Sequence, residues 1–160
     1  MIMNKYLAEL AKLNLIDWPT LALGIDNGWI DKDAISSYAF ERLHHGETDG
    51  DIALLAGSDA LSEDEVSELL ATLCKKNSIS TQEANPLALE KWRLAILSEL
   101  QNSSLPPEEK LERLQELYAD FGYPEDMASC SIYAQDGADP LDALQKTINT
   151  LEQRLTSSNG

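Results

Sequence analysis

The chain has 160 residues, and 43% of them are hydrophobic, which is enough to bury the core of one ordinary domain. Its 28 acidic and 12 basic side chains give a formal net charge of −16, and each half of the chain holds 14 acids and 6 bases. Such a field repels nucleic acid and anionic membranes and attracts basic proteins. The composition therefore argues against direct nucleic-acid binding.

Neither a targeting segment nor a cofactor is indicated. The first residues, MIMNKYLAELAKLNLIDW, lack the apolar core of a signal peptide, and no apolar run approaches the roughly 18 residues that span a bilayer. We expect a cytoplasmic protein without a cofactor. Cys74 and Cys130 lack the spacing of a zinc site or a disulfide framework. Cys74 follows Leu70 on an apolar helical face, which predicts a core residue rather than a reactive thiol.

The first half of the chain has the apolar spacing of α-helices. Asp17 is placed to cap a helix that has Pro19 in its first turn, and Ser62 with Glu65 forms a capping box of the SxxE kind. The predicted helices cover residues 3–13, from 18 to 24 or 28, from 31 or 33 to 46, 51–57 and 62–74. In the last of these, the buried face is expected to be Val66, Leu69, Leu70, Leu73 and Cys74.

The second half of the chain continues the helical pattern. Pro86 suits the first turn of the longest helix, whose apolar residues from Leu87 to Leu100 cover more than one face, as is typical of a central helix. The predicted helices cover residues 86–101, 106–121, a short segment within 124–135, and 141–155. In the final helix Leu141, Leu144, Ile148, Leu151 and Leu155 form a narrow seam of the coiled-coil kind.

The whole pattern predicts an all-α fold, because strand alternation with hairpin turns is not evident. We expect a single compact domain of about seven to nine helices over residues 1–156, with a frayed tail over 157–160. An arrangement of stacked helical pairs stays open.

The stretch ERLHHGETDGD, residues 41–51, holds both histidines beside four carboxylates. Neighbouring helical residues point about 100° apart, so His44 and His45 cannot easily chelate one ion from a regular helix. Glu41 and His44 form one Glu-x-x-His pair, whereas di-iron helical bundles use two. The pattern is explained by histidines at a helix C-terminus, a glycine stop and an aspartate cap for the next helix. We therefore predict no metal site here.

Catalytic motifs are not recognisable in the sequence. It contains no GxSxG nucleophile elbow, no GxGxxG or GxxxxGK phosphate loop, and no Cys/His motif with a third orienting group. Carboxylates are plentiful, but their spacing singles out no acid and base pair. We therefore expect a protein that is not an enzyme and has no catalytic residues.

The acids are unevenly placed along the chain. We call residues 47–68 the first acidic zone and residues 116–142 the second acidic zone, and neither contains a lysine or an arginine. The acids of the two zones are Glu47, Asp49, Asp51, Asp59, Glu63, Asp64, Glu65 and Glu68, then Glu116, Asp120, Glu125, Asp126, Asp136, Asp139 and Asp142. Solvated helix termini explain part of this pattern, but solubility needs far less charge. We therefore expect a surface that meets a basic groove in a partner.

Aromatic residues near turns are expected to supply anchors for such a surface. Trp18, Trp29, Tyr123 and Tyr133 lie at such places, whereas Trp92 lies on the long apolar helix and is expected in the core. The candidate partner-binding set is therefore the acids of both zones, apart from Asp142, together with Tyr123 and Tyr133.

Two stretches carry a family resemblance. ELYADFGYPEDMASCSIYAQ, residues 116–135, is similar to a YADFxYPEDM sequence of an uncharacterised bacterial family found among immunity proteins, and LNLIDWPTLALGIDNGWID resembles the opening of that family. The chain as a whole resembles small acidic immunity proteins of contact-dependent growth inhibition and polymorphic-toxin systems. The motif residues are Tyr118, Asp120, Phe121, Tyr123, Pro124, Glu125, Asp126 and Met127. Ser129, Cys130 and Ser131 stand where larger apolar residues are expected.

The resemblance implies a cytoplasmic protein that binds a toxin domain delivered by a neighbouring cell and blocks its active site or substrate entry. Such toxins are often nucleases with basic clefts, which an acidic immunity protein suits, so a basic nuclease is the expected partner. We expect a monomer or a 1:1 complex with the toxin. Whether the motif contacts the toxin or builds the fold stays open. One alternative is a non-catalytic helical adaptor that self-associates through the seam of the final helix or binds another basic protein. A second is a metal-dependent hydrolase at Glu41, His44 and His45.

Overall fold

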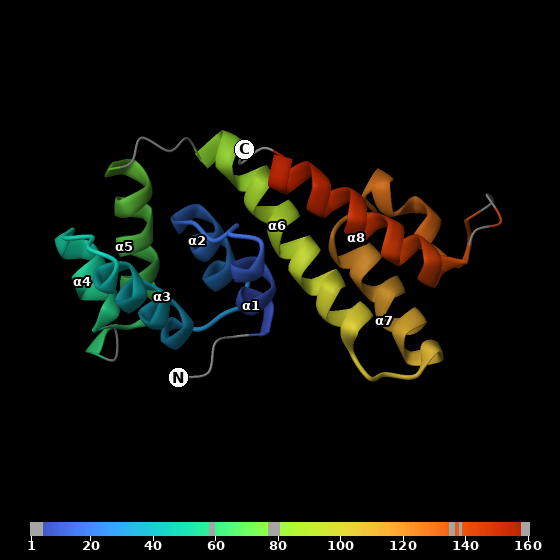
Figure 1. The fold of residues 1–160 in the computed structure, drawn as a ribbon, viewed down its shortest axis with the longest axis horizontal. Coiled ribbons are helices and arrows are strands. Elements are labelled where there is room, and N and C mark those ends of the chain that lie inside the picture. Colours follow the sequence, from blue (N-terminus) through green and yellow to red (C-terminus); the bar gives the residue numbers. More distant parts are fainter. Residues whose placement is uncertain (1–4, 58–59, 77–80, 135–136, 138, 158–160) are drawn as a thin grey trace. The chain divides into compact units, whose positions relative to one another are not determined.

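The computed structural model describes residues 5–57, 60–76, 81–134, 137 and 139–157. Within these residues every regular element is a helix (Figure 1), which confirms the all-α prediction and its seven to nine helices. The helices are α1 (Lys5–Lys12), α2 (Trp18–Asp26), α3 (Lys32–His44), α4 (Gly50–Ala56), α5 (Glu63–Lys76), α6 (Thr81–Asn102), α7 (Pro107–Asp120), the 3-10 helix η2 (Glu125–Cys130) and α8 (Pro140–Ser157).

Contacts divide the chain into two compact units, with the boundary inside α6. Unit 1 is Met1–Trp92 and unit 2 is Arg93–Gly160. The single domain over residues 1–156 stays a prediction, and residues 158–160 of the predicted tail lie outside the described part of the chain. None of the helices in the described residues is long and apolar enough to cross a membrane.

Side-chain caps start the helices of unit 1 where the sequence predicts them. Asp17 accepts the backbone N–H of Thr20 at 2.9 Å and so begins α2. Asp31 and Asp49 cap α3 and α4 in the same way. Ahead of α5, the Ser62 hydroxyl accepts the N–H of Glu65 while the Glu65 carboxylate accepts the N–H of Ser62, both at 3.2 Å. The predicted capping box is therefore confirmed.

The core of unit 1 gathers around Trp92, which is fully buried as predicted. Its indole N–H donates to the carbonyl of Thr20 at 2.7 Å, and its ring lies 5.6 Å from that of Trp29. Gly24 makes this approach possible, because a Cβ there would lie 2.3 Å from a Trp92 ring carbon. Trp29 is half-buried in this contact rather than free at a turn.

A buried lysine ties the N-terminal resemblance stretch to α6. The Lys91 side chain is 5% exposed, and its Nζ lies 2.8 Å from the Asp17 carboxylate that also caps α2. Removing a buried charge from water is costly unless a partner compensates it. Asp17 therefore stabilises unit 1 through two contacts at once.

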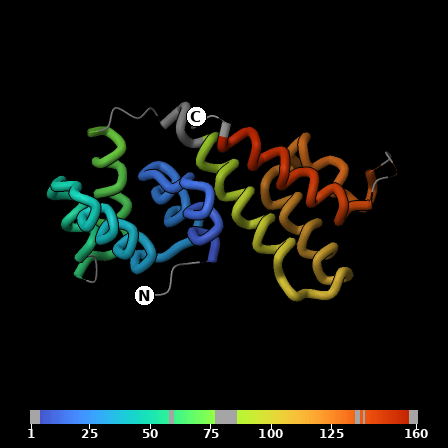
Figure 2. Tube along the Cα trace, in the orientation of Figure 1, coloured from blue at the N-terminus to red at the C-terminus, as the bar shows by residue number. Residues whose placement is uncertain are grey.

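Unit 2 is built from the end of α6, the helices α7 and α8, and η2. Figure 2 shows the chain turning back after α6, so that α7 runs antiparallel to it. The η2 segment packs on both α7 and α8. Its residues Met127 and Cys130 are fully buried, and the Cys130 Sγ lies 3.7 Å from the Thr147 hydroxyl oxygen. The small Cys130 therefore fills a core position where a larger apolar residue was expected.

The seam of α8 faces the inside of the chain. Four of its side chains are buried, namely Leu144, Ile148, Leu151 and Leu155, and Leu141 is half-buried. The predicted apolar stripe is confirmed, but these side chains are already packed within the chain. They are not available to a second copy unless the fold opens.

Three predictions about packing need correction or refinement. Helix α6 begins at Thr81, so the prediction that Pro86 lies in its first turn is wrong. Leu87 and Leu89 are 38% and 40% exposed, so the apolar residues of α6 do not all lie in the core. In α5, Val66, Leu70, Leu73 and Cys74 are buried as predicted, while Leu69 is half-buried.

Candidate functional site

In the first acidic zone, bases from its borders neutralise three acids. Glu47 accepts hydrogen bonds from Arg42 Nε at 3.2 Å and Nη2 at 2.6 Å. Lys76 Nζ lies 3.2 Å from Asp49 and 2.6 Å from Asp51. The pKa of Asp49 is lowered, first by the backbone N–H of Asp51 and then by Lys76, and the pKa of Lys76 is raised mainly by its hydrogen bond to Asp51.

The remaining described acids of the first acidic zone lie in the first two turns of α5. Glu63, Asp64, Glu65 and Glu68 are exposed, and within the described residues none of them forms an ion pair. Asp59 lies outside the described residues. Glu65 already serves the capping box, and no large hydrophobic side chain among residues 60–76 is exposed. This part of the zone is therefore charged but offers no apolar anchor.

The histidine stretch forms the end of α3. His45 Nε2 lies 3.7 Å from Glu41, an ion pair when the imidazole is protonated. Residues four apart lie on the same face of a helix, so this contact follows from the helix geometry. The two imidazole rings lie 6.0 Å apart. Across the described residues, no group of three or more His, Cys, Asp or Glu is placed to hold a metal ion.

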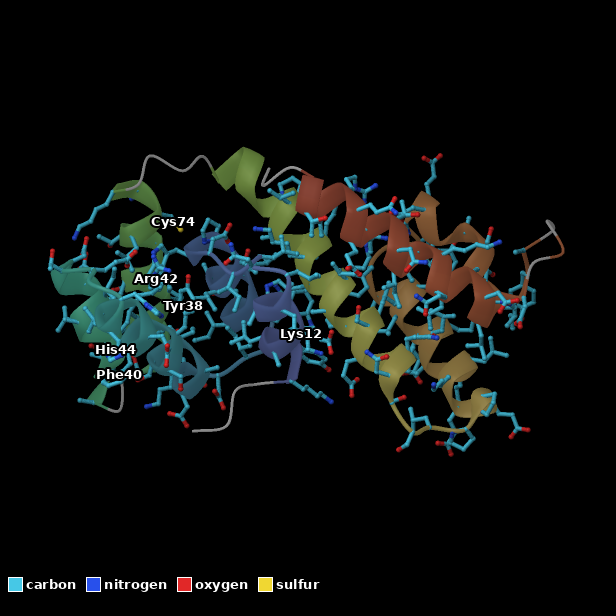
Figure 3. All side chains as sticks on the ribbon, in the orientation of Figure 1. Lys12, Tyr38, Phe40, Arg42, His44 and Cys74 are labelled. Atoms are coloured by element: carbon cyan, nitrogen blue, oxygen red, sulfur yellow. The ribbon has the colours of Figure 1, made fainter. Side chains whose placement is uncertain are left out.

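A hollow of about 440 Å³ lies beside α3 in unit 1. Its lining residues are Ala11, Asn14, Ile16, Ser37, Tyr38, Phe40, Glu41, Arg42 and His45. Figure 3 shows Phe40 and His44 along one side of α3, with Tyr38 and Arg42 along another. The pKa of Tyr38 is raised, mainly by burial, and its hydroxyl faces the Ile16 carbonyl at 3.4 Å. With Arg42 held by Glu47, the hollow offers mainly apolar packing rather than a nucleophile and base.

Phe40 is the feature of unit 1 that sequence reasoning missed. Its side chain is 60% exposed at the edge of this hollow. Its position on α3 gives no signal of exposure, because the apolar residues of this helix do not gather on one face. Trp18, by contrast, is half-buried and makes an edge-on contact with Tyr38, with ring centroids 5.1 Å apart.

In the second acidic zone, Asp126 is engaged inside unit 2. Both of its oxygens accept hydrogen bonds from the Arg93 guanidinium, and one lies 3.3 Å from Arg154 Nη2. The Arg93 side chain is 7% exposed. These arginines, Arg93 foremost, lower the pKa of Asp126. Asp126 was a candidate for partner binding, but its carboxylate is used to compensate a buried charge.

The other acids of the second acidic zone lie at the surface. Glu116 pairs with Arg113 at 2.8 Å, and both side chains are about half exposed. Asp139 accepts the N–H of Leu141 at 3.3 Å, which caps α8. Asp120, Glu125 and Asp142 are exposed and form no ion pair within the described residues. Asp136 lies outside the described residues.

A polar hollow of about 520 Å³ lies along α8. Its lining residues are Asp126, Ser129, Gly137, Asp139, Asp142, Ala143, Lys146, Thr147 and Thr150. The side chain of Lys146 offsets part of the negative charge at its wall. Both cysteine thiols are buried, and burial is the main cause that raises the pKa of Cys74 and of Cys130. Neither thiol is therefore suited to act as a thiolate nucleophile.

A tyrosine pair stands where α7 ends. Gly122 and Tyr123 both have positive φ, +78° and +57°, and the Tyr123 N–H donates to the Tyr118 carbonyl at 2.9 Å. The left-handed conformation costs a residue with a Cβ about 1 to 2 kcal/mol. The rings of Tyr118 and Tyr123 meet edge to face, 5.1 Å apart. Tyr123 is nevertheless 65% exposed, so the motif places a ring at the surface in a fixed direction.

Gln115 fixes the chain that follows η2. Its Nε2 donates to the Cys130 carbonyl at 2.8 Å, and its Oε1 accepts the N–H of Ile132 at 3.1 Å. The segment that follows η2 is thereby held against α7. It leaves Ile132 50% and Tyr133 84% exposed. Tyr133 was predicted as an anchor, whereas Ile132 and the role of Gln115 carry no signal in the sequence.

The bases of the chain are largely engaged in internal contacts. Nine of the twelve lysines and arginines donate hydrogen bonds to carboxylates or carbonyls of the chain, namely Lys12, Lys32, Arg42, Lys76, Lys91, Arg93, Lys110, Arg113 and Arg154. Seven of these nine donate to carboxylates, so their charges are paired within the chain, whereas Lys32 and Lys110 donate to backbone carbonyls.

These features define an acidic all-α protein with an aromatic corner on its second acidic zone. Residues 7–159 match the family described as "Uncharacterized protein conserved in bacteria (DUF2247)", and the chain belongs to that family. No curated protein and no solved structure matches the chain.

Proposed function

We propose that this protein is an immunity protein that binds and neutralises the toxin domain of a contact-dependent growth inhibition system. The second acidic zone docks on the basic, substrate-receiving cleft of a nuclease and excludes its nucleic acid. The proposal rests on two features that this zone combines. It has exposed acids that form no ion pair within the described residues, namely Asp120, Glu125 and Asp142. It also has three exposed large hydrophobic side chains, namely Tyr123, Ile132 and Tyr133.

Charge and aromatic anchors have complementary effects at such an interface. Exposed carboxylates steer a basic partner and speed its encounter, while buried aromatic side chains supply most of the binding energy. The zone has both, since its acids are exposed and Tyr123 and Tyr133 are the two most exposed large hydrophobic side chains in the described residues. A nuclease cleft that accepts a phosphate backbone presents the matching positive charge.

The family resemblance supports the same proposal. The YADFxYPEDM-like motif forms the corner between α7 and η2, with Asp126 and Met127 directed into unit 2 and Tyr123 at the surface. The motif thus both builds the fold and presents a ring to solvent. We place the action in the cytoplasm, where the nucleic acid that the toxin attacks is found, and expect a monomer that forms a 1:1 complex.

The alternative is a helical adaptor that self-associates through the seam of α8. No feature of the structure favours it, because Leu144, Ile148, Leu151 and Leu155 are packed within the chain. A hydrolase at Glu41, His44 and His45 is likewise without support from the geometry. His45 faces Glu41 at the exposed end of α3, and no group of three ligands is placed to hold a metal ion among the residues that the structure describes.

Co-expression with the toxin domain encoded next to this gene tests the proposal. We expect growth of the toxin-expressing cells to be rescued, and the purified pair to form a complex whose affinity falls steeply between about 50 mM and about 500 mM salt. Neutralising Asp120, Glu125 and Asp142 together is expected to abolish rescue. Rescue that persists in this variant, with salt-independent binding, would contradict docking through the second acidic zone.

A further inference from the structure

Tyr123 holds a backbone conformation that a tyrosine adopts only under strain. Its φ is +57°, and the other positive φ values of the described residues belong to Asn14 and to glycines, which tolerate that region. Since the side chain is 65% exposed, burial of the ring does not offset the strain. Strain of this kind persists where the surrounding structure fixes a residue for a function.

The Tyr123 ring keeps an aromatic face open to solvent. The plane of the Tyr123 ring makes an angle of 88° with the plane of the half-buried Tyr118 ring. An edge-to-face contact of this kind covers at most one face of either ring. Exposed carboxylates flank this tyrosine in the chain, Asp120 at the end of α7 and Glu125 at the start of η2. Neither carboxylate forms an ion pair in the part of the chain that the structure describes.

We propose that Tyr118, Tyr123, Asp120 and Glu125 form a receptor site for one arginine side chain of the partner protein. A guanidinium group stacks on an aromatic face and donates N–H groups to carboxylates, so both parts of the site are used. The inference rests on the proposed function, and it names the residues of the docking surface that recognise the partner. An apolar partner side chain would instead leave the two carboxylates desolvated and without hydrogen bonds.

Arginine is favoured over lysine at this site. The ammonium group of lysine is compact and strongly hydrated, whereas the planar guanidinium is weakly hydrated and stacks on rings. General attraction to the acidic surface acts on both side chains equally. A preference for arginine that depends on Tyr123 therefore distinguishes a built site from a diffuse negative field.

The test titrates the full chain with a short arginine homopeptide and with the lysine homopeptide of the same length, by calorimetry at low salt. We expect the wild type to bind the arginine peptide about fivefold more tightly, as cation–π stacking adds to the charge attraction. In Tyr123→Gly this ratio is expected to fall to about one, because the ring is gone while glycine adopts the same φ without strain. Phe40→Ala, which removes an exposed ring from unit 1, is the matched control and keeps the ratio.

A second variant of Tyr123, tested for both peptide binding and thermal stability, separates loss of the ring from strain. Tyr123→Ala is expected to lose the arginine preference to the same extent but to melt below Tyr123→Gly, because alanine retains the strain. If Tyr123→Gly keeps the wild-type preference for arginine, the inference is overturned, while docking through the acidic surface stands. If neither peptide binds the wild type at low salt, both the inference and the electrostatic basis of the proposed function are overturned.

Discussion

The two acidic zones look alike in the sequence but differ as surfaces. In the first acidic zone, Glu47, Asp49 and Asp51 are neutralised by Arg42 and Lys76. The other described acids lie on α5, on which no large hydrophobic side chain is exposed; this zone does expose Leu54, on α4, to 55%. In the second acidic zone, the Asp126 carboxylate pairs with two arginines, Arg93 and Arg154. Of the other described acids of this zone, Glu116 pairs with Arg113, whereas Asp120, Glu125 and Asp142 are exposed and form no ion pair in the described part of the chain. Tyr123, Ile132 and Tyr133 of the same zone are exposed as well. Net charge along the chain therefore does not tell how much charge a partner meets.

The largest expected effect comes from the acid that the second acidic zone uses internally. Asp126→Ala leaves the buried Arg93 guanidinium without its partner, and we expect the free energy of unfolding to fall by about 3 to 5 kcal/mol. Chemical denaturation measures this loss. The control Asp120→Ala, an exposed acid of the same zone, is expected to change stability by less than about 0.5 kcal/mol. Equal effects of the two substitutions would contradict the division of the zone into internal and external acids.

The same contact predicts how stability depends on pH. Since Arg93 lowers the pKa of Asp126, the folded state releases this proton more readily than the unfolded state. The stabilisation is therefore complete above the ordinary aspartate pKa of about 3.9 and is lost as the pH falls through the lowered folded value. Denaturation at several pH values should show a loss in this range that is smaller in Asp126→Asn. If the free energy of unfolding of Asp126→Asn depends on pH as that of the wild type does, Asp126 does not account for the loss of stability at low pH.

The smallest expected effect concerns the first acidic zone. Lys76→Gln frees Asp49 and Asp51, and because both ion pairs lie at the surface we expect little change in the denaturation midpoint. The variant also turns paired acids into unpaired ones without an aromatic neighbour. Its affinity for the toxin domain should rise by no more than about twofold through the added negative charge. A gain of about tenfold or more would show that unpaired charge alone makes a docking surface.

The sequence predicted helix starts well because the caps are local. Asp17 with Thr20 and Ser62 with Glu65 act over three residues, so their chemistry is visible in a short window. Pro86 was misplaced because the preference of proline for a first turn is only a tendency. Residues that follow Pro86 in this helix, such as Trp92 and Leu97, are buried, and tertiary contacts override such local preferences.

The ion pairs could not be predicted, since their partners are distant in the chain. Lys76 and Asp49 are 27 residues apart, and Arg93 and Asp126 are 33 residues apart. Which acid meets a base depends on how the helices pack, and no spacing rule contains that information. Tyr123 and Tyr133 could be predicted as aromatic residues near turns, because turn signals are local. The Gln115 contacts that hold Ile132 beside α7 could not be predicted, because they depend on packing.

The central claim is that the second acidic zone, rather than total charge, binds the partner. The most direct test compares two triple variants that each reduce the formal charge from −16 to −13: Asp120→Asn/Glu125→Gln/Asp142→Asn in the second acidic zone and Glu63→Gln/Asp64→Asn/Glu68→Gln in the first. Calorimetry measures their affinity for the neighbouring toxin domain. We expect the second-zone variant to lose about tenfold or more and the first-zone variant about twofold or less. Equal losses in the two variants, or a larger loss in the first-zone variant, would contradict the claim.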